Sequence, residues 1–387
     1  MASRLYRTTQ ALYLVIEGLL GSLGIASIGS PTLAALICLY VTGLVILDGR
    51  RTQTRVALIL PARCHDALNR LLRLMPLSTR MLMTLLVSCV KRLGIEGYLC
   101  LDDVIVEKAF ADKLPWAGWT YSWSKERKLF GLHIVVLVWC SLDGRWRIPV
   151  AFRIQRPKRS CGKRGYQTKL ELAWDMLREV VASGLPFQYL AMDTVYTAGW
   201  FSRGATRLGL VWVGTLQPKT TVVYQGKRFS VKELGLLLHL KWRRHLEVRA
   251  LSLAVYTPSY GMLKLVVTRN RHGSYDYIAT NDLEADLTKL VLRKRSRWSV
   301  ETVFRDTKQL AGLESCQARV DRAMVRHVSL VLLSFAVLQF LRSSPSETVG
   351  QVKQRWQTAI ARAGESPPPP LKACPPYLRP HPLTSTA

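Results

Sequence analysis

The chain has 387 residues, with 55 lysines and arginines against 26 aspartates and glutamates, so its formal net charge is +29. A hydrophobic fraction of 49% is enough for a sizeable core and argues against a disordered chain. The charge favours a polyanionic partner, either nucleic acid or an anionic membrane surface, and argues against a small-molecule enzyme of ordinary composition.

Residues 1–95 are predicted to form a helical N-terminal domain, because apolar residues recur there at helical spacing. No charged residue lies between Glu17 and Asp48, which raises the alternative of a membrane anchor. Glycines and Pro31 interrupt this stretch, and its most apolar part, Leu33–Leu47, is shorter than the roughly 20 residues that a membrane span needs. We therefore favour buried helices over an anchor.

Residues 96–217 read as strand, hairpin, helix, strand, helix, strand, a pattern typical of a mixed α/β layer with a partly parallel sheet. Alternating segments rich in lysine and arginine follow, and we predict a β-rich insertion over 218–282. The chain is then predicted to be helical over 283–345. The proline-rich composition after that indicates a mobile tail over 346–387.

The eight cysteines form no Cys-x-x-Cys pair, so a zinc ribbon or finger is not expected. Several lie in apolar runs, and we interpret them as reduced, buried thiols.

Three acidic residues are candidates for chemistry. Asp102 and Asp193 each close an apolar strand, and strand ends are where open α/β sheets place their active sites. Glu301 lies on a predicted helix with Arg297 and Lys308 on the same face, four residues before it and seven after it. Carboxylates suit Mg²⁺, and the two cations suit DNA phosphates. The alternatives are turn-forming aspartates and a solvated helix face with charge pairing.

Three blocks of sequence carry a resemblance: Leu101-Asp-Asp-Val-Ile-Val-Glu-Lys108, Ala191-Met-Asp-Thr-Val-Tyr196, and Arg297-Trp-Ser-Val-Glu301 continuing through Lys308-Gln-Leu-Ala-Gly-Leu313. Together they resemble the DDE motifs of bacterial insertion-sequence transposases, whose RNase H-like catalytic core is shared with retroviral integrases. The resemblance covers roughly residues 35–340. It implies an α/β fold with an RNase H-like mixed sheet flanked by helices, a β-rich insertion and a helical N-terminal domain.

The resemblance also implies roles. Asp102, Asp193 and Glu301 would hold two Mg²⁺ or Mn²⁺ ions for cleavage at the transposon end and for strand transfer into target DNA. Arg297 and Lys308 match the basic positions of the family's Tyr-Arg-Glu-Lys signature, whereas Lys294 stands at the tyrosine position. The doublet leaves Asp102 or Asp103 as the first ligand. Asp102 is preferred because relatives commonly read Asp-x-Thr, with Val104 here at the threonine position.

Two basic segments flank the predicted site in sequence order, and a tryptophan of the insertion is surrounded by cations. Basic loops can follow DNA phosphates, and tryptophans can stack on bases, although solvated loops and ordinary packing are the alternatives. The same choice applies to Trp212 and to the aromatic run at 116, 119, 121 and 123. The expected DNA contacts are Arg156, Lys158, Arg159, Lys163, Arg164, Lys294, Arg297, Lys308, Trp242, Arg243 and Arg244.

As partners, the resemblance implies double-stranded DNA, both transposon ends and target, bound by a homodimer, with no membrane. It implies a nucleoid-associated protein of the bacterial cytoplasm. Two other hypotheses remain: a catalytically inactive DNA-binding relative and, less favoured, a membrane-associated basic protein.

Overall fold

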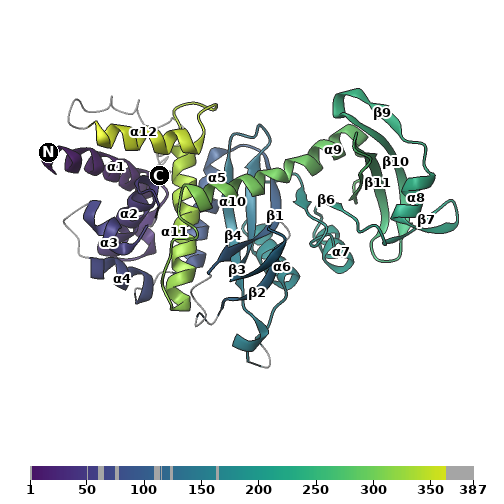
Figure 1. Ribbon diagram of the computed structural model, residues 1–387. Coiled ribbons are helices and arrows are strands. Elements are labelled where there is room, and N and C mark those ends of the chain that lie inside the picture. The colour runs from purple at the N-terminus through teal and green to yellow at the C-terminus, as the bar shows by residue number, and fades with distance from the viewer. Residues whose placement is uncertain are drawn as a thin grey trace, which may run out of the picture.

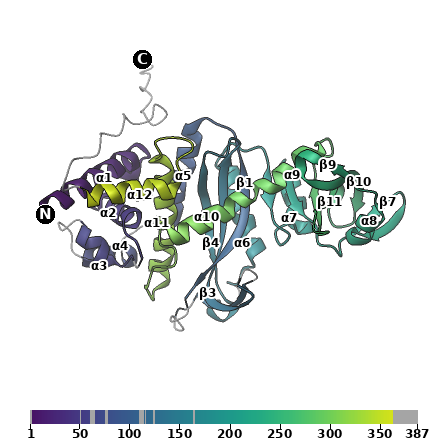
Figure 2. The same ribbon diagram turned by 45° about the horizontal axis from the view of Figure 1, so that its top comes forward.

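The computed structural model describes residues 2–49, 51–59, 65–74, 78–108, 114, 116–122, 125–162 and 165–362. Figure 1 shows three parts in a row: a helical part that holds the N-terminus, a central sheet with helices on it, and a β-rich end. The same order is visible after the molecule is turned (Figure 2).

One mixed sheet of 12 strands runs through the molecule, in the order β2-β3-β1-β5-β6-β12-β11-β10-β7-β8, with β4 on β3 and β9 on β10. The half of the sheet in the centre of the molecule consists of β1 (Gly97–Glu107), β2 (Gly118–Ser122), β3 (Arg127–Ser141), β4 (Arg147–Gln155), β5 (Leu190–Met192) and β6 (Trp212–Thr215). The pairs β1–β3 and β3–β4 are antiparallel, whereas β1–β5 and β5–β6 are parallel. The predicted mixed α/β class with a partly parallel sheet is confirmed.

The β-rich end continues the same sheet, because β12 pairs with β6 in antiparallel fashion. It consists of β7 (Thr221–Tyr224), β8 (Lys227–Ser230), α8 (Val231–Leu237), β9 (Lys241–Arg243), β10 (Val248–Thr257), β11 (Gly261–Arg269) and β12 (Tyr275–Thr280). A small core of its own, with Val266, Ile278 and Leu290 among its members, joins it to α9 (Leu287–Ser296). The predicted insertion is therefore anchored by strand pairing and by this core.

Four further helices pack on the sheet. α6 (Lys169–Ala182) begins at a capping box formed by Thr168 and Glu171, and α7 (Gly199–Arg207) follows β5. α9 and α10 (Trp298–Gln309) run one after the other from the β-rich end toward the helical part (Figure 1). α9 contacts β5, β6 and β12, and α10 contacts β1 and β4, so the two helices cross the middle of the sheet.

The helical part combines both ends of the described chain. It contains α1 (Ala2–Ser22), α2 (Pro31–Ile46), α3 (Gln53–Ile59), α4 (His65–Arg73), α5 (Thr79–Leu93), α11 (Asp321–Phe340) and α12 (Val349–Ala361). The uncharged stretch of the N-terminus supplies buried residues of α2, such as Ile37 and Leu44. Within the described residues, α11 is the helix long and apolar enough to cross a membrane, and 89% of its most apolar window is buried inside the protein.

The predicted mobile tail differs from the structure at its start. Residues 349–361 form α12, which buries Val352, Trp356 and Ile360. Those residues are spaced four apart, which is the spacing of one helix face. The prediction of a mobile tail rested on the prolines, which cluster beyond the end of α12. Residues 363–387 lie outside the described residues.

Candidate active site

Strand register places Asp102 and Asp193 beside each other. Leu101 of β1 is the register partner of Met192, the last residue of β5. Asp102 follows Leu101 and Asp193 follows Met192. Because the two strands are parallel and neighbouring strands lie about 4.8 Å apart, the two aspartates lie side by side. Consistent with this, the charge of Asp193 contributes to raising the pKa of Asp102.

The turn after β5 fixes the carboxylate of Asp193. Its Oδ1 accepts hydrogen bonds from the backbone N–H groups of Val195 and Tyr196, at 2.9 and 3.1 Å. Thr197 donates its hydroxyl to the Asp193 carbonyl oxygen at 2.6 Å. Gly214 of β6 leaves the space for this threonine, because a Cβ there would lie 2.1 Å from Thr197 Oγ1.

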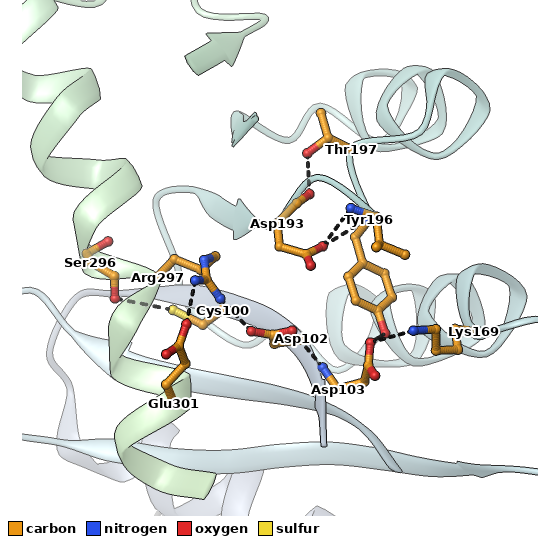
Figure 3. Close-up of polar contacts among 11 residues, drawn as sticks. Cys100, Asp102, Asp103, Lys169, Asp193, Tyr196, Thr197, Ser296, Arg297 and Glu301 are labelled. Carbon is orange, nitrogen blue, oxygen red and sulfur yellow. Dashed lines mark hydrogen bonds and ion pairs between the residues drawn. The ribbon is translucent and has the colours of Figure 1, made fainter. Parts of the chain in front are cut away.

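Arg297, between α9 and α10, links the third acid to the first. One guanidinium nitrogen lies 2.5 Å from Asp102 Oδ2, and the other lies 2.5 Å from Glu301 Oε1 (Figure 3). The Arg297 side chain is only 19% exposed. Burial opposes its charge, but the surrounding carboxylates, Asp102 first, raise its pKa above the usual value. Arg297 therefore acts as the counter-ion of this cluster.

One arginine does not neutralise the three acids. Burial and the charge of Asp193 raise the pKa of Asp102 to about 7, although Arg297 opposes the shift. Burial also raises the pKa of Asp193, against the hydrogen bonds from Tyr196 and Val195. Carboxylates with raised pKa values, packed together in one place, are typical of functional sites.

Asp103 has different partners. His133 Nε2 lies 2.6 Å from Oδ2, while Lys169 Nζ at 3.0 Å and the hydroxyl of Tyr196 at 2.9 Å contact Oδ1. Burial alone would raise the pKa of Asp103, but the hydrogen bond and charge of His133, together with Lys169, hold it at about 2. Of the two aspartates, Asp102 therefore shares Arg297 with Glu301, whereas the carboxylate of Asp103 is paired with His133 and Lys169.

The cluster has the donor chemistry of a site for a divalent cation. Carboxylate oxygens are the ligands that Mg²⁺ and Mn²⁺ prefer. Burial, and for Asp102 also the charge of Asp193, raises the pKa of these carboxyls, so a bound cation would favour their ionised forms. Within the described residues, however, no group of three or more His, Cys, Asp or Glu side chains is arranged to hold a metal ion. Arg297 stands between two of the acids, so metal binding would require it to move.

Comparison with protein families gives a match over residues 26–233, more than half of the chain, to the family described as DDE superfamily endonuclease. The chain belongs to the DDE superfamily endonucleases. The matched range includes Asp102 and Asp193, whereas Glu301 lies beyond it.

Among solved structures, the chain is similar to a piggyBac transposase synaptic complex with hairpin DNA, solved by cryo-electron microscopy. The similarity covers 90% of this chain and 76% of the other, with 11% sequence identity and a TM-score of 0.47. The comparison with curated proteins finds no match.

Three of the predicted DNA-binding cations of this DDE endonuclease are engaged inside the protein. Lys308 Nζ donates to the carbonyl oxygen of Ile105 at 2.8 Å and lies 3.1 Å from Glu314. Lys294 pairs with Asp276. Arg297 is the third. Lys308 and Arg297 thus support the strand and acids of the candidate site.

The predicted basic loop lies at the surface. Arg156 stacks over Trp116 at 4.1 Å, Lys158 lies 5.2 Å from the ring centre of Tyr166, and Arg159 donates to Ala117. Lys163, Arg164 and Trp123 lie outside the described residues.

The predicted contacts in the β-rich end are partly exposed. Trp242 is 46% exposed, with Arg271 over its ring, Arg244 is exposed and Arg243 is half-buried. Trp212, by contrast, is 1% exposed and donates from Nε1 to Thr206, so packing is its role.

Sequence reasoning missed the partners of Asp103. His133, Lys169 and Tyr196 come from β3, from the start of α6 and from the turn after β5. Tyr196 carried a signal, since it lies three residues after Asp193 in a matching motif block. No local pattern marks His133 or Lys169, because their contact to β1 spans distant segments.

Proposed function

We propose that this DDE endonuclease is a transposase of an insertion sequence, which cleaves DNA at the element's ends and joins them to target DNA. Asp102, Asp193 and Glu301 are its catalytic carboxylates. The observation that carries this proposal is the meeting of the middle of β1 and the end of β5 with α10, which brings the acids of all three motif blocks to one place.

The chemistry follows from the donor set. Two Mg²⁺ or Mn²⁺ ions held by Asp102, Asp193 and Glu301 would supply an activated water or 3′-hydroxyl and stabilise the leaving oxygen. Backbone hydrogen bonds already hold two of these carboxylates in position. The backbone N–H of Asp103 donates to Asp102 Oδ1 at 2.9 Å, and the amides of Val195 and Tyr196 hold Asp193.

Arg297 has two tasks in this proposal. Without DNA, its guanidinium balances Asp102 and Glu301. With DNA, the same planar group suits a backbone phosphate, which it can bind through two parallel hydrogen bonds. Its release from the acids would then couple DNA binding to opening of the cation site.

We propose double-stranded DNA as the partner, both element ends and target, bound by a homodimer in the bacterial cytoplasm at the nucleoid. The net charge of +29 supports a polyanionic partner. We expect no membrane association, because the uncharged N-terminal stretch contributes buried residues of α2 to the core.

A second candidate function is DNA binding without catalysis. It is favoured by one observation: Arg297 occupies the space between Asp102 and Glu301, and the described acids do not form a ready metal site.

Strand cleavage separates the two. The substrate is DNA that carries the element's terminal inverted repeats, assayed with Mg²⁺ and then with EDTA. We expect the wild type to cleave in Mg²⁺ and not in EDTA. In Asp193→Asn and Glu301→Gln, the cleavage rate in Mg²⁺ should fall by about 100-fold or more. Glu284→Gln, at an exposed acid, is the matched control and should cleave normally. Cleavage by both site variants at the wild-type rate would refute the catalytic assignment.

A further inference from the structure

A second site lies at the edge of the central sheet. β2 is its outermost strand, at the lower side of the sheet in Figure 1. Beside it is a hollow of about 220 Å³, lined by β2, β3, the end of β4 and the loop after β4. Its walls include Trp116, Trp119, His133, Arg156, Lys158 and Tyr166.

Two aromatic rings of the hollow are open to solvent. The Trp119 side chain is 70% exposed, and its ring rests edge-on against Phe130 with centroids 5.6 Å apart. Tyr166 is 37% exposed. Packing therefore holds one side of Trp119 and leaves a large aromatic surface uncovered, which is suited to stacking on another flat ring.

The cations of the hollow are paired with rings and with backbone. Arg156 lies 4.1 Å from the ring centre of Trp116, and Lys158 lies 5.2 Å from that of Tyr166. Arg159 donates to the carbonyl oxygen of Ala117 at 2.9 Å, which fixes the start of β2. The sequence from 153 to 169 contains no acid. Positive charge beside flat rings suits a ligand with an aromatic face and a phosphate.

The hollow lies on the Asp103 side of β1. His133 lines it, and His133 Nε2 lies 2.6 Å from Asp103, whose side chain points to the opposite face of the strand from that of Asp102. Its size also restricts the ligand, because pockets for drug-sized molecules start at roughly 300 Å³. A hollow of about 220 Å³ suits one ring system.

We propose that this hollow binds a single unpaired nucleobase of DNA, stacked on Trp119, with Arg156 and Lys158 contacting the adjoining phosphates. A base in an intact duplex presents only its edge to a protein, so the base must leave the stack to use the ring face. The inference rests on the proposed function in taking DNA as the substrate, and it adds that an unpaired strand end or flap is held at the β2 edge of the sheet, on the side of β1 opposite the carboxylates.

The test is binding, measured in EDTA so that cleavage plays no part. The probes are a fluorescein-labelled duplex with a short single-stranded overhang and the blunt duplex of the same sequence, followed by fluorescence anisotropy. Trp119→Ala should weaken binding of the overhang probe by about tenfold, since stacking on one aromatic ring contributes on that scale. Binding of the blunt probe should change by less than about twofold. Trp119→Phe, which keeps a ring, should restore most of the affinity.

Trp200→Ala is the matched control, because Trp200 is also a half-exposed tryptophan, 44% exposed on α7. It should bind both probes as the wild type does. Tyr166→Ala provides an independent variant of the hollow, with the same expected selective loss, should Trp119→Ala fail to fold. Equal losses on both probes, or no loss on either, would overturn the proposal. Selective loss without any Mg²⁺-dependent cleavage would leave the hollow standing and refute the transposase assignment alone.

Discussion

The two sides of β1 carry neighbouring carboxylates in opposite electrostatic states. On one side Asp102 shares a single arginine with Glu301 and lies near Asp193, and its pKa is raised to about 7. On the other side Asp103 has a histidine, a lysine and a tyrosine hydroxyl to itself, and its pKa is held at about 2.

We interpret this difference as one between a structural role for Asp103 and the proposed catalytic role for Asp102. The Asp103 side is complete, because three donors from three segments satisfy one carboxylate. The Asp102 side brings three carboxylates together with one guanidinium, an arrangement that folding does not require and that costs stability. Carboxylates in excess over cations, in the middle of β1 and next to the end of β5, favour the binding of a further cation.

The largest expected effect is that replacing the two aspartates changes different properties: Asp102 cleavage, and Asp103 stability. Asp102→Asn should lower DNA cleavage by about 100-fold or more, because a charged ligand is lost, while the protein stays as stable as the wild type or becomes more stable. Asp103→Asn should lower the free energy of unfolding by about 3–5 kcal/mol, because it breaks a buried ion pair and leaves Lys169 without its counter-charge. Cleavage assays and urea unfolding measure the two effects.

Asp175→Asn serves as the control for stability, since the hydrogen bond that Asp175 accepts from Gln167 is exposed to solvent. It should change neither readout. If Asp102→Asn destabilised the fold as strongly as Asp103→Asn, the contrast between the two sides of β1 would be wrong.

The parts of the site that were predictable from sequence are those encoded locally. Apolar runs ending in Asp102 and Asp193 predicted two strands, and the structure has β1 and β5 there, with a register that puts the acids together. The prediction that Asp102 closes its strand is wrong, because β1 continues to Glu107 through its pairing with β3. Spacing placed Arg297 and Glu301 on one helix face, and they do contact each other. Their catalytic roles remain predictions.

The rest depends on contacts between distant segments. Lys308 does share the face of Glu301, but that face packs on β1, so its ammonium reaches Ile105 instead of solvent. Likewise, Lys294 of α9 forms an ion pair with Asp276 of β12, in the β-rich end. A helical pattern specifies which side chains point the same way, and only packing decides what they meet.

A second prediction concerns Arg297, the cation that stands between Asp102 and Glu301. Because its guanidinium and a metal ion compete for the same oxygens, Arg297→Ala should bind Mn²⁺ about tenfold or more tightly than the wild type in the absence of DNA. Isothermal titration calorimetry measures this affinity. Arg297→Lys keeps the charge and should stay close to the wild type. Unchanged or weaker Mn²⁺ binding in Arg297→Ala would show that the arginine does not compete with the metal.

The smallest expected effect is a pH dependence that belongs to the Asp102 side. A carboxyl whose pKa rises from 3.8 to about 7 on folding binds more protons in the native state than in the unfolded state. The stability that this group contributes is therefore lost as the pH rises from about 4 to about 7. Asp103, whose pKa is lowered to about 2, has the opposite effect at lower pH, since its contribution to stability is lost only as the pH falls below about 4.

Urea unfolding in EDTA at pH 5 and pH 8 measures this effect. Between these two pH values, the free energy of unfolding should fall by about 1–2 kcal/mol more for the wild type than for Asp102→Asn. Comparing the two proteins cancels the other titrating groups, and Mn²⁺ should remove the difference by binding the ionised form. An identical pH response in both proteins would mean that Asp102 is ionised without cost, and the carboxylate cluster would then need no cation beyond Arg297.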